Sequence, residues 1–132
     1  MAELRTEPLP RVVDDLMTED LIALGPDDRV GRARDLMLAL GVHALPILDE
    51  ERTVGIVTST DLVDDWPEDT ELAVVMSTVL LVIDRSADLA EAAETMLAHH
   101  VHHLVVMDSS ETVGLVSSFD LLRALAATAR SR

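Results

Sequence analysis

Apolar and polar residues alternate along this chain with two different periods. In two stretches the apolar residues recur every three or four positions, which predicts a helix in each stretch. The residues with this spacing are Val30, Ala33, Met37 and Leu40 in the first stretch and Leu89, Ala92 and Met96 in the second. We expect Asp27 or Asp28 to cap the first helix and Ser86 to cap the second. Gly41 is expected to end the first helix.

Short runs of almost continuous apolar residues surround these helices and predict strands that are buried on both faces. An extended segment precedes each helix, at Leu21–Leu24 and at Val79–Ile83. A hairpin follows each helix, with strands at Ala44–Leu48 and Thr53–Thr58 and then at Leu104–Met107 and Thr112–Ser117. A second helix is expected to close each set, over Thr60–Trp66 and over Phe119–Arg130.

The same order of residues occurs twice, because a shift of 59 positions aligns Asp15–Trp66 with Val74–Leu125 without a gap. The chain is therefore expected to be an α/β protein (α+β by some schemes), a tandem repeat of two βαββα units. One unit is too small to cover its own sheet. We expect the two units to pack sheet to sheet with pseudo-two-fold symmetry, leaving clefts where the closing helices begin, and small ligands tend to bind in such clefts. The expected boundaries are 12–66 for the first unit, 67–73 for the linker and 74–126 for the second unit, with flexible ends at 1–11 and 127–132.

Composition excludes several classes of function. The formal net charge is −15, and an acidic surface repels nucleic acid and anionic membranes. The absence of cysteine excludes disulfides and thiolate catalysis. No targeting segment or spanning helix is evident, so a cytoplasmic location is expected. The catalytic triad order, the P-loop and the dinucleotide-binding glycine pattern are absent, so we do not expect an enzyme.

A hydroxyl and a carboxylate recur three residues apart at the end of each hairpin, in Thr58-x-x-Asp61 and Ser117-x-x-Asp120. A carboxylate can accept hydrogen bonds from both hydroxyls of a ribose, and a hydroxyl beside helix N–H groups suits a phosphate. The same spacing also fits a capping box, in which the two side chains satisfy the helix's own donors. The spacing alone favours the capping interpretation over the ligand-binding one.

The ordered set of these motifs resembles the CBS domain, a family named for cystathionine beta-synthase and normally found as tandem pairs. The first copy carries it as Leu16-Met17-Thr18, Pro26-Asp27, Val42–Asp49 and Gly55–Leu62. The second carries it as Met76-Ser77, Val101–Asp108 and Gly114–Leu121. The resemblance covers the chain from about Val12 to Leu125. It implies a regulatory pair that often dimerises and often binds AMP, ADP, ATP or S-adenosylmethionine, without an obligatory cofactor.

The resemblance also implies roles for individual residues. Asp61 and Asp120 would hold ribose hydroxyls, and Thr58 and Ser117 would lie near phosphate. Further ligand contacts are expected at Thr18, His43, Ala44, Pro46, Thr60, Ser77, His102, His103, Val105 and Phe119.

The chain departs from the family pattern where a basic residue often precedes the aspartate, since Thr60 and Phe119 stand there. Only His43, His102 and His103 remain as weak cations nearby, which favours AMP, adenosine or S-adenosylmethionine over a triphosphate. Pro46 is replaced by Val105 in the second copy, so the two clefts are expected to differ in shape, with a vacant second cleft as the alternative. The ligand would be read by a separate effector protein, with a homodimer expected. The alternative is a structural or dimerisation module that binds no ligand.

Two further clusters are expected to be structural. The histidines of His99–His103 could ligate a metal ion, but they stand across a helix end and a strand start, so their side chains diverge. We expect His99 and His100 to be solvated and His102 to be structural. Five methionines occupy periodic core positions and are expected to pack; they are Met17, Met37, Met76, Met96 and Met107.

Overall fold

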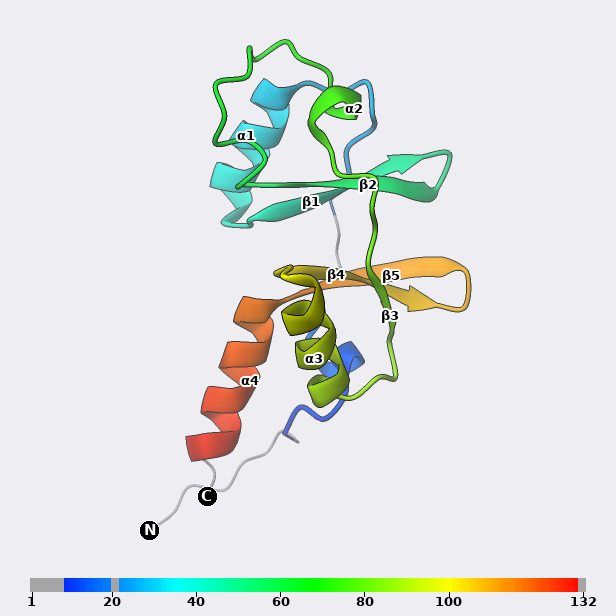
Figure 1. The fold of residues 1–132 in the computed structure, drawn as a ribbon, viewed down its shortest axis with the longest axis vertical. Coiled ribbons are helices and arrows are strands. Elements are labelled where there is room, and N and C mark those ends of the chain that lie inside the picture. The colour runs from blue at the N-terminus through cyan, green and yellow to red at the C-terminus, as the bar shows by residue number, and fades with distance from the viewer. Residues whose placement is uncertain (1–8, 20–21, 131–132) are drawn as a thin grey trace. The chain divides into compact units, whose positions relative to one another are not determined.

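The computed structural model describes residues 9–19 and 22–130, which belong to two compact units (Figure 1). The first-repeat unit consists of residues 22–81. The second-repeat unit combines residues 9–19 with residues 82–130. Each unit contains helices and a sheet, so the expected α/β class is confirmed.

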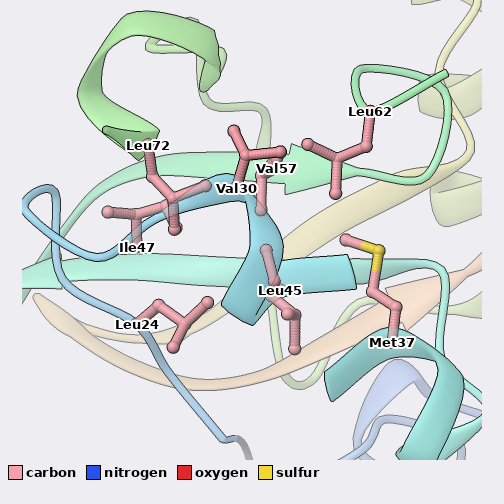
Figure 2. Packing of buried hydrophobic residues seen from close by; sticks show 9 residues of the cluster. Leu24, Val30, Met37, Leu45, Ile47, Val57, Leu62 and Leu72 are labelled. Atoms are coloured by element: carbon pink, nitrogen blue, oxygen red, sulfur yellow. The ribbon is translucent and has the colours of Figure 1, made fainter. Parts of the chain in front are cut away.

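The first-repeat unit packs two helices on a hairpin. Its elements are α1 (Val30–Leu40), β1 (Ala44–Asp49), β2 (Arg52–Thr58) and α2 (Leu72–Val75). The two strands are antiparallel, and Leu24 adds a parallel bridge to Ile47. Figure 2 shows the apolar cluster between these elements, in which Val30, Ile47, Val57 and Leu72 have no exposed surface. Burial of about 25 cal/mol per Å² of this apolar surface is the main stabilising term.

The second-repeat unit repeats this architecture with one more regular strand and one more long helix. Its elements are the 3-10 helix η1 (Val13–Asp15), β3 (Val82–Asp84), α3 (Leu89–His99), β4 (His103–Asp108), β5 (Glu111–Ser117) and α4 (Ser118–Arg130). The sheet order is β3-β4-β5, with β3 parallel to β4 and β5 antiparallel to it. In Figure 1, α3 and α4 lie on the same side of this sheet.

The segment that opens each repeat packs on the hairpin of the other repeat. Thr18 exchanges two backbone hydrogen bonds with Leu115 of β5, at 2.9 and 3.2 Å, and Ser77 exchanges two with Ile56 of β2, at 2.9 and 3.0 Å. The approach is so close that a Cβ on Gly55 would lie 2.5 Å from Met76 Sδ. The compact unit and the sequence repeat therefore have different boundaries.

Most predicted elements are confirmed. Both hairpins, both long helices and the helix over Phe119–Arg130 are present. Gly41 ends α1 in the left-handed conformation, with φ +66°. The extended segments are shorter than expected: β3 covers only Val82–Asp84, and Leu24 forms a single bridge. Leu21 lies outside the described residues. Met17, Met37 and Met96 are buried, and Met76 and Met107 are partly buried.

The predicted helix over Thr60–Trp66 is wrong, because this segment forms turns and bends and then irregular backbone. Val63 and two adjacent aspartates are weak helix formers, and Pro67 disfavours helical geometry in the residue before it. The stretch before the proline is also too short to repay helix nucleation. The equivalent segment in the second repeat is rich in leucine and alanine and continues as α4 to Arg130.

The predicted N-caps of the two long helices are also wrong. Arg29, not Asp27 or Asp28, is the N-cap of α1, and no side chain caps this helix. Instead, the N–H groups of Val30 and Gly31 donate to the carbonyl oxygens of Thr70 and Glu68, so the chain before α2 caps α1 with its backbone. In α3 the N-cap is Asp88, not Ser86, and its carboxylate accepts from Glu91 N–H at 2.8 Å.

An ion-pair network holds the opening segment within the second-repeat unit. Arg85 Nη2 lies 2.6 Å from Asp14 Oδ1, and Arg85 Nη1 lies 3.2 Å from Asp108 Oδ2. Hydrogen bonds to Asp14 and then to Asp108 raise the pKa of Arg85. The network is partly exposed, so its contribution is small and sensitive to salt.

Candidate ligand site

The two hydroxyl–carboxylate motifs adopt the same reciprocal geometry. Thr58 N–H donates to Asp61 Oδ2 at 2.9 Å, and Asp61 N–H donates back to Thr58 Oγ1 at 3.2 Å. In the second repeat the corresponding distances are 2.8 Å from Ser117 N to Asp120 Oδ2 and 3.1 Å from Asp120 N to Ser117 Oγ. These are the bonds that the capping-box interpretation requires. Each hydroxyl oxygen accepts a bond here, so its own hydrogen is still available to a further acceptor.

The hairpins fix both motifs in place. Thr58 is the last residue of β2 and pairs with Ala44, and Ser59 N–H donates to His43 O at 2.9 Å. Likewise Ser117 ends β5 opposite His103, and Ser118 N–H donates to His102 O at 2.8 Å. The start of one strand thus anchors the end of the next, and the carboxylate is positioned by rigid backbone.

The chain after Asp61 is held by a residue that the sequence did not point to. Arg34 of α1 donates to three backbone carbonyls, those of Leu62, Asp64 and Trp66, at 3.0, 3.1 and 3.3 Å. Trp66 Nε1 in turn donates to Asp61 O at 3.2 Å. These side chains satisfy carbonyls that a helix would have paired internally. Ala93 occupies the position of Arg34 in the second repeat, where α4 supplies the helix.

The chain after Asp120 carries a cation that the sequence analysis also missed. Arg123 Nη2 lies 2.5 Å from Asp120 Oδ1, and its guanidinium lies 5.2 Å from the centre of the Phe119 ring. The Asp120 side chain is 8% exposed, whereas Arg123 is 65% exposed. The i, i+3 and i, i+4 spacing of these residues on a helix was a usable signal for this contact.

The candidate site residues fall into two equivalent sets, one in each unit. Thr18 lies in the segment before the first repeat's long helix and pairs with β5. Ser77 lies in the equivalent segment of the second repeat and pairs with β2. The side chains of His43, Thr60, His102 and Phe119 are exposed. Ala44, Pro46 and Val105 are buried within their hairpins, and Thr58, Ser117 and His103 are partly exposed. Each unit therefore presents an exposed ring or hydroxyl beside a carboxylate.

The histidines at the end of α3 and directly after it do not form a cluster. His99 and His100 are exposed, and His100 adopts a left-handed conformation, φ +53°, as the C-cap of α3. His102 Nδ1 lies 3.3 Å from Ser118 Oγ. Within residues 9–19 and 22–130, no three histidine, aspartate or glutamate side chains are grouped to hold a metal ion. The same part of the chain holds no helix that is long and apolar enough to span a bilayer.

The fold and the duplicated motif define a tandem repeat of one α/β domain. The profile of the CBS domain matches residues 13–67 and 71–127, so this chain belongs to the CBS domain family and carries two copies of the domain.

Relatives include both small proteins and larger enzymes. Inosine-5'-monophosphate dehydrogenase of Methanocaldococcus jannaschii is 30% identical over 112 residues, which cover 83% of this chain but 23% of the enzyme. The chain spans less than half of the length of the first curated relatives that it matches, and the match to this enzyme covers only its CBS part.

Solved structures with this fold match over nearly the whole chain. A putative acetoin utilization protein (AcuB) from Vibrio cholerae is 27% identical, with a TM-score of 0.79, covering 92% of this chain and 95% of that one. CBSX2, solved in complex with AMP, is 25% identical, with a TM-score of 0.76, covering 92% of this chain and 98% of that one.

Proposed function

We propose that this chain is a regulatory module that binds an adenosine-containing ligand, with Asp61 and Asp120 accepting the ribose hydroxyls. The observation that carries the proposal is the duplicated hydroxyl–carboxylate pair, fixed by backbone at the end of both hairpins. Membership of the CBS family and the AMP complex of CBSX2 support the ligand class. The candidates are AMP, ADP, ATP and S-adenosylmethionine.

The chemistry suits a ribose 5'-phosphate. A carboxylate offers two oxygens to the two adjacent hydroxyls of ribose, which are both donors. The hydroxyl of Thr58 or Ser117 accepts the aspartate N–H, so its hydrogen can be donated to a phosphate oxygen. In this proposal the motif keeps its capping bonds while the ligand is bound.

The binding test is ligand-induced stabilisation. AMP, ADP, ATP and S-adenosylmethionine are each added to the parent protein, and the unfolding midpoint is measured. A ligand present at about 100 times its Kd stabilises the folded state by about 2.7 kcal/mol. For a chain of this size, this raises the midpoint by roughly 10 °C.

Asparagine variants connect that stabilisation to the two motifs. In Asp61→Asn and Asp120→Asn the side-chain amide keeps one oxygen for the Thr58 or Ser117 N–H, but it cannot accept both ribose hydroxyls. Each variant is expected to lose part of the stabilisation, and the double variant all of it. Asp88→Asn, which alters a capping aspartate outside the motifs, is the matched control. A double variant that responds like the parent would show that these carboxylates do not hold the ligand.

The alternative function is a structural module without a ligand. The observation that favours it is the reciprocal bonding itself, which satisfies the motif's own N–H donors. A structural module would keep the same unfolding midpoint with all four compounds. The two functions therefore separate in the first experiment.

The proposal also includes a homodimer and a separate effector protein that responds to ligand binding. Phe119, Leu122 and Leu125 of α4 are each more than 60% exposed, which supports a homodimer that covers them. The ligand would then shift the packing of the copies, and a separate effector protein would respond to that shift. Light scattering decides whether the 14.4 kDa chain is dimeric in solution.

A further inference from the structure

The residue three positions after the candidate carboxylate differs between the two repeats. Position 123 of the second repeat corresponds to position 64 of the first, and the residues there are Arg123 and Asp64. Arg123 contacts Asp120, whereas Asp64 is exposed and lies in a turn rather than a helix. At this one position the formal charge therefore differs by two units between the two repeats.

Arg123 donates to Oδ1 of Asp120, the carboxylate oxygen that does not accept the capping hydrogen bond from Ser117. Asp120 Oδ2 accepts the Ser117 N–H, and Asp120 Oδ1 accepts Arg123 Nη2 at 2.5 Å. Ribose hydroxyls would have to share or displace the second of these bonds. Among hydrogen bonds between described residues, the Asp61 carboxylate uses Oδ2 alone, so Oδ1 remains available.

Arg123 is held in this position from a second side. Its guanidinium stacks over the ring of Phe119, one turn earlier on α4, at 5.2 Å from the ring centre. Thr60, the equivalent of Phe119, offers no such ring in the first repeat. Moving Arg123 away from Asp120 therefore breaks a charge-assisted hydrogen bond and disturbs a cation–π contact.

We propose that the two sites have unequal affinity: the Asp61 site binds the adenosine ligand more tightly, and Arg123 weakens the Asp120 site by competing for its carboxylate. This inference rests on the proposed function. Because the guanidinium is mostly exposed and the contact is screened by water, we expect a difference of about threefold to tenfold in Kd.

The experiment is calorimetric titration of the full chain with AMP. The parent is expected to show two dissociation constants. Asp61→Asn removes the tighter one and Asp120→Asn the weaker one. Arg123→Gln keeps a side chain of similar length without the charge, and we expect it to strengthen the weaker site by about threefold to tenfold while leaving the tighter site unchanged. Arg130→Gln, the same change near the end of the same helix, is the control for net charge and is expected to alter neither constant.

The single tryptophan provides an independent assignment. Trp66 donates to the backbone oxygen of Asp61, so its fluorescence reports on the Asp61 site. We expect the fluorescence change to follow the tighter constant in the parent and to be unaffected by Arg123→Gln.

Specific outcomes would overturn the inference. Equal affinities in the parent, or an Arg123→Gln variant whose weaker site is unchanged, would mean that Arg123 does not compete. If Arg123→Gln weakens AMP binding but not adenosine binding, Arg123 contacts the phosphate, and the inference is wrong while the proposed function stands. If neither the parent nor any variant binds AMP, ADP, ATP, adenosine or S-adenosylmethionine, the proposed function itself fails.

Discussion

The long helices of the two repeats end in the same left-handed backbone conformation, but with different residues. Gly41 and His100 are equivalent C-caps, with φ values of +66° and +53°. Glycine adopts this left-handed conformation without strain, whereas a residue with a Cβ does so at a cost. Apart from the two neighbouring residues in the chain, no heavy atom lies within 4 Å of a Cβ built on Gly41, so at that position backbone strain, and not crowding, sets the preference.

This comparison predicts that His100→Gly stabilises the protein. Relief of left-handed strain should raise the free energy of unfolding, partly offset by the greater freedom of glycine in the unfolded chain, for a net gain of about 0.5–1 kcal/mol. Urea denaturation measures the change. The reciprocal variant Gly41→Ala should lose about 1 kcal/mol. A loss of stability in His100→Gly would mean that the imidazole makes a contact that outweighs the strain.

At the scale of elements, side-chain hydrogen bonds in the segment over Thr60–Trp66 take the place of the backbone hydrogen bonds of a helix. The carbonyls after Asp61 have no helix to pair with, and Arg34 and Trp66 bond to them instead. The same arginine therefore connects α1 to the turn that positions a candidate binding carboxylate.

We predict that Arg34→Met releases this turn. Methionine retains the apolar stem, so the loss isolates the guanidinium bonds, and charge-assisted hydrogen bonds of this kind are worth about 2 kcal/mol together when partly exposed. Unfolding followed by Trp66 fluorescence measures the loss, and the native emission should also shift to the red. Arg32→Met, at an exposed position of the same helix, is the control. Equal stability of the two variants would show that the turn holds without Arg34.

Elements whose signal is local were predictable, and contacts between distant segments were not. The long helices and hairpins follow from apolar spacing, and the same spacing occurs in both repeats, which supports each prediction with a second copy. The reciprocal bonds of Thr58 with Asp61 were anticipated because they span three residues. The contacts of Arg34 span 28 to 32 residues and left no local pattern. Nor does any periodicity say that Met17 packs against Gly114, a contact made with the other repeat's hairpin.

At the scale of the whole molecule, the chain is interleaved between its two units. In the second-repeat unit Thr18 pairs with Leu115 of β5, and in the first-repeat unit Ser77 pairs with Ile56 of β2. A cut in the acidic stretch between the repeats would therefore separate each sheet from one of its own segments. The interleaving provides a physical reason for the tandem occurrence of the two copies in one chain.

The charge of the whole molecule leads to the last prediction. Twenty-five acidic residues against ten arginines give a formal net charge of −15, so the folded chain repels itself. Salt shortens the screening length from about 10 Å at 0.1 M to about 3 Å at 1 M, which weakens this repulsion. Salt also weakens attractive pairs such as Arg85 with Asp14, but partly exposed pairs contribute only about 0–1 kcal/mol each.

The screening of repulsion should therefore outweigh the screening of the ion pairs. We expect the free energy of unfolding to rise by on the order of 1 kcal/mol between 0.05 and 0.5 M NaCl. Urea denaturation at each salt concentration measures the rise. Neutralising the exposed acidic residues before α2, in a combined variant of Asp64→Asn, Asp65→Asn, Glu68→Gln and Asp69→Asn, should increase stability at low salt and reduce the salt response. A rise that is the same in this variant would point to salt acting on apolar burial instead. A fall in stability with salt would mean that the arginine pairs outweigh the repulsion among carboxylates.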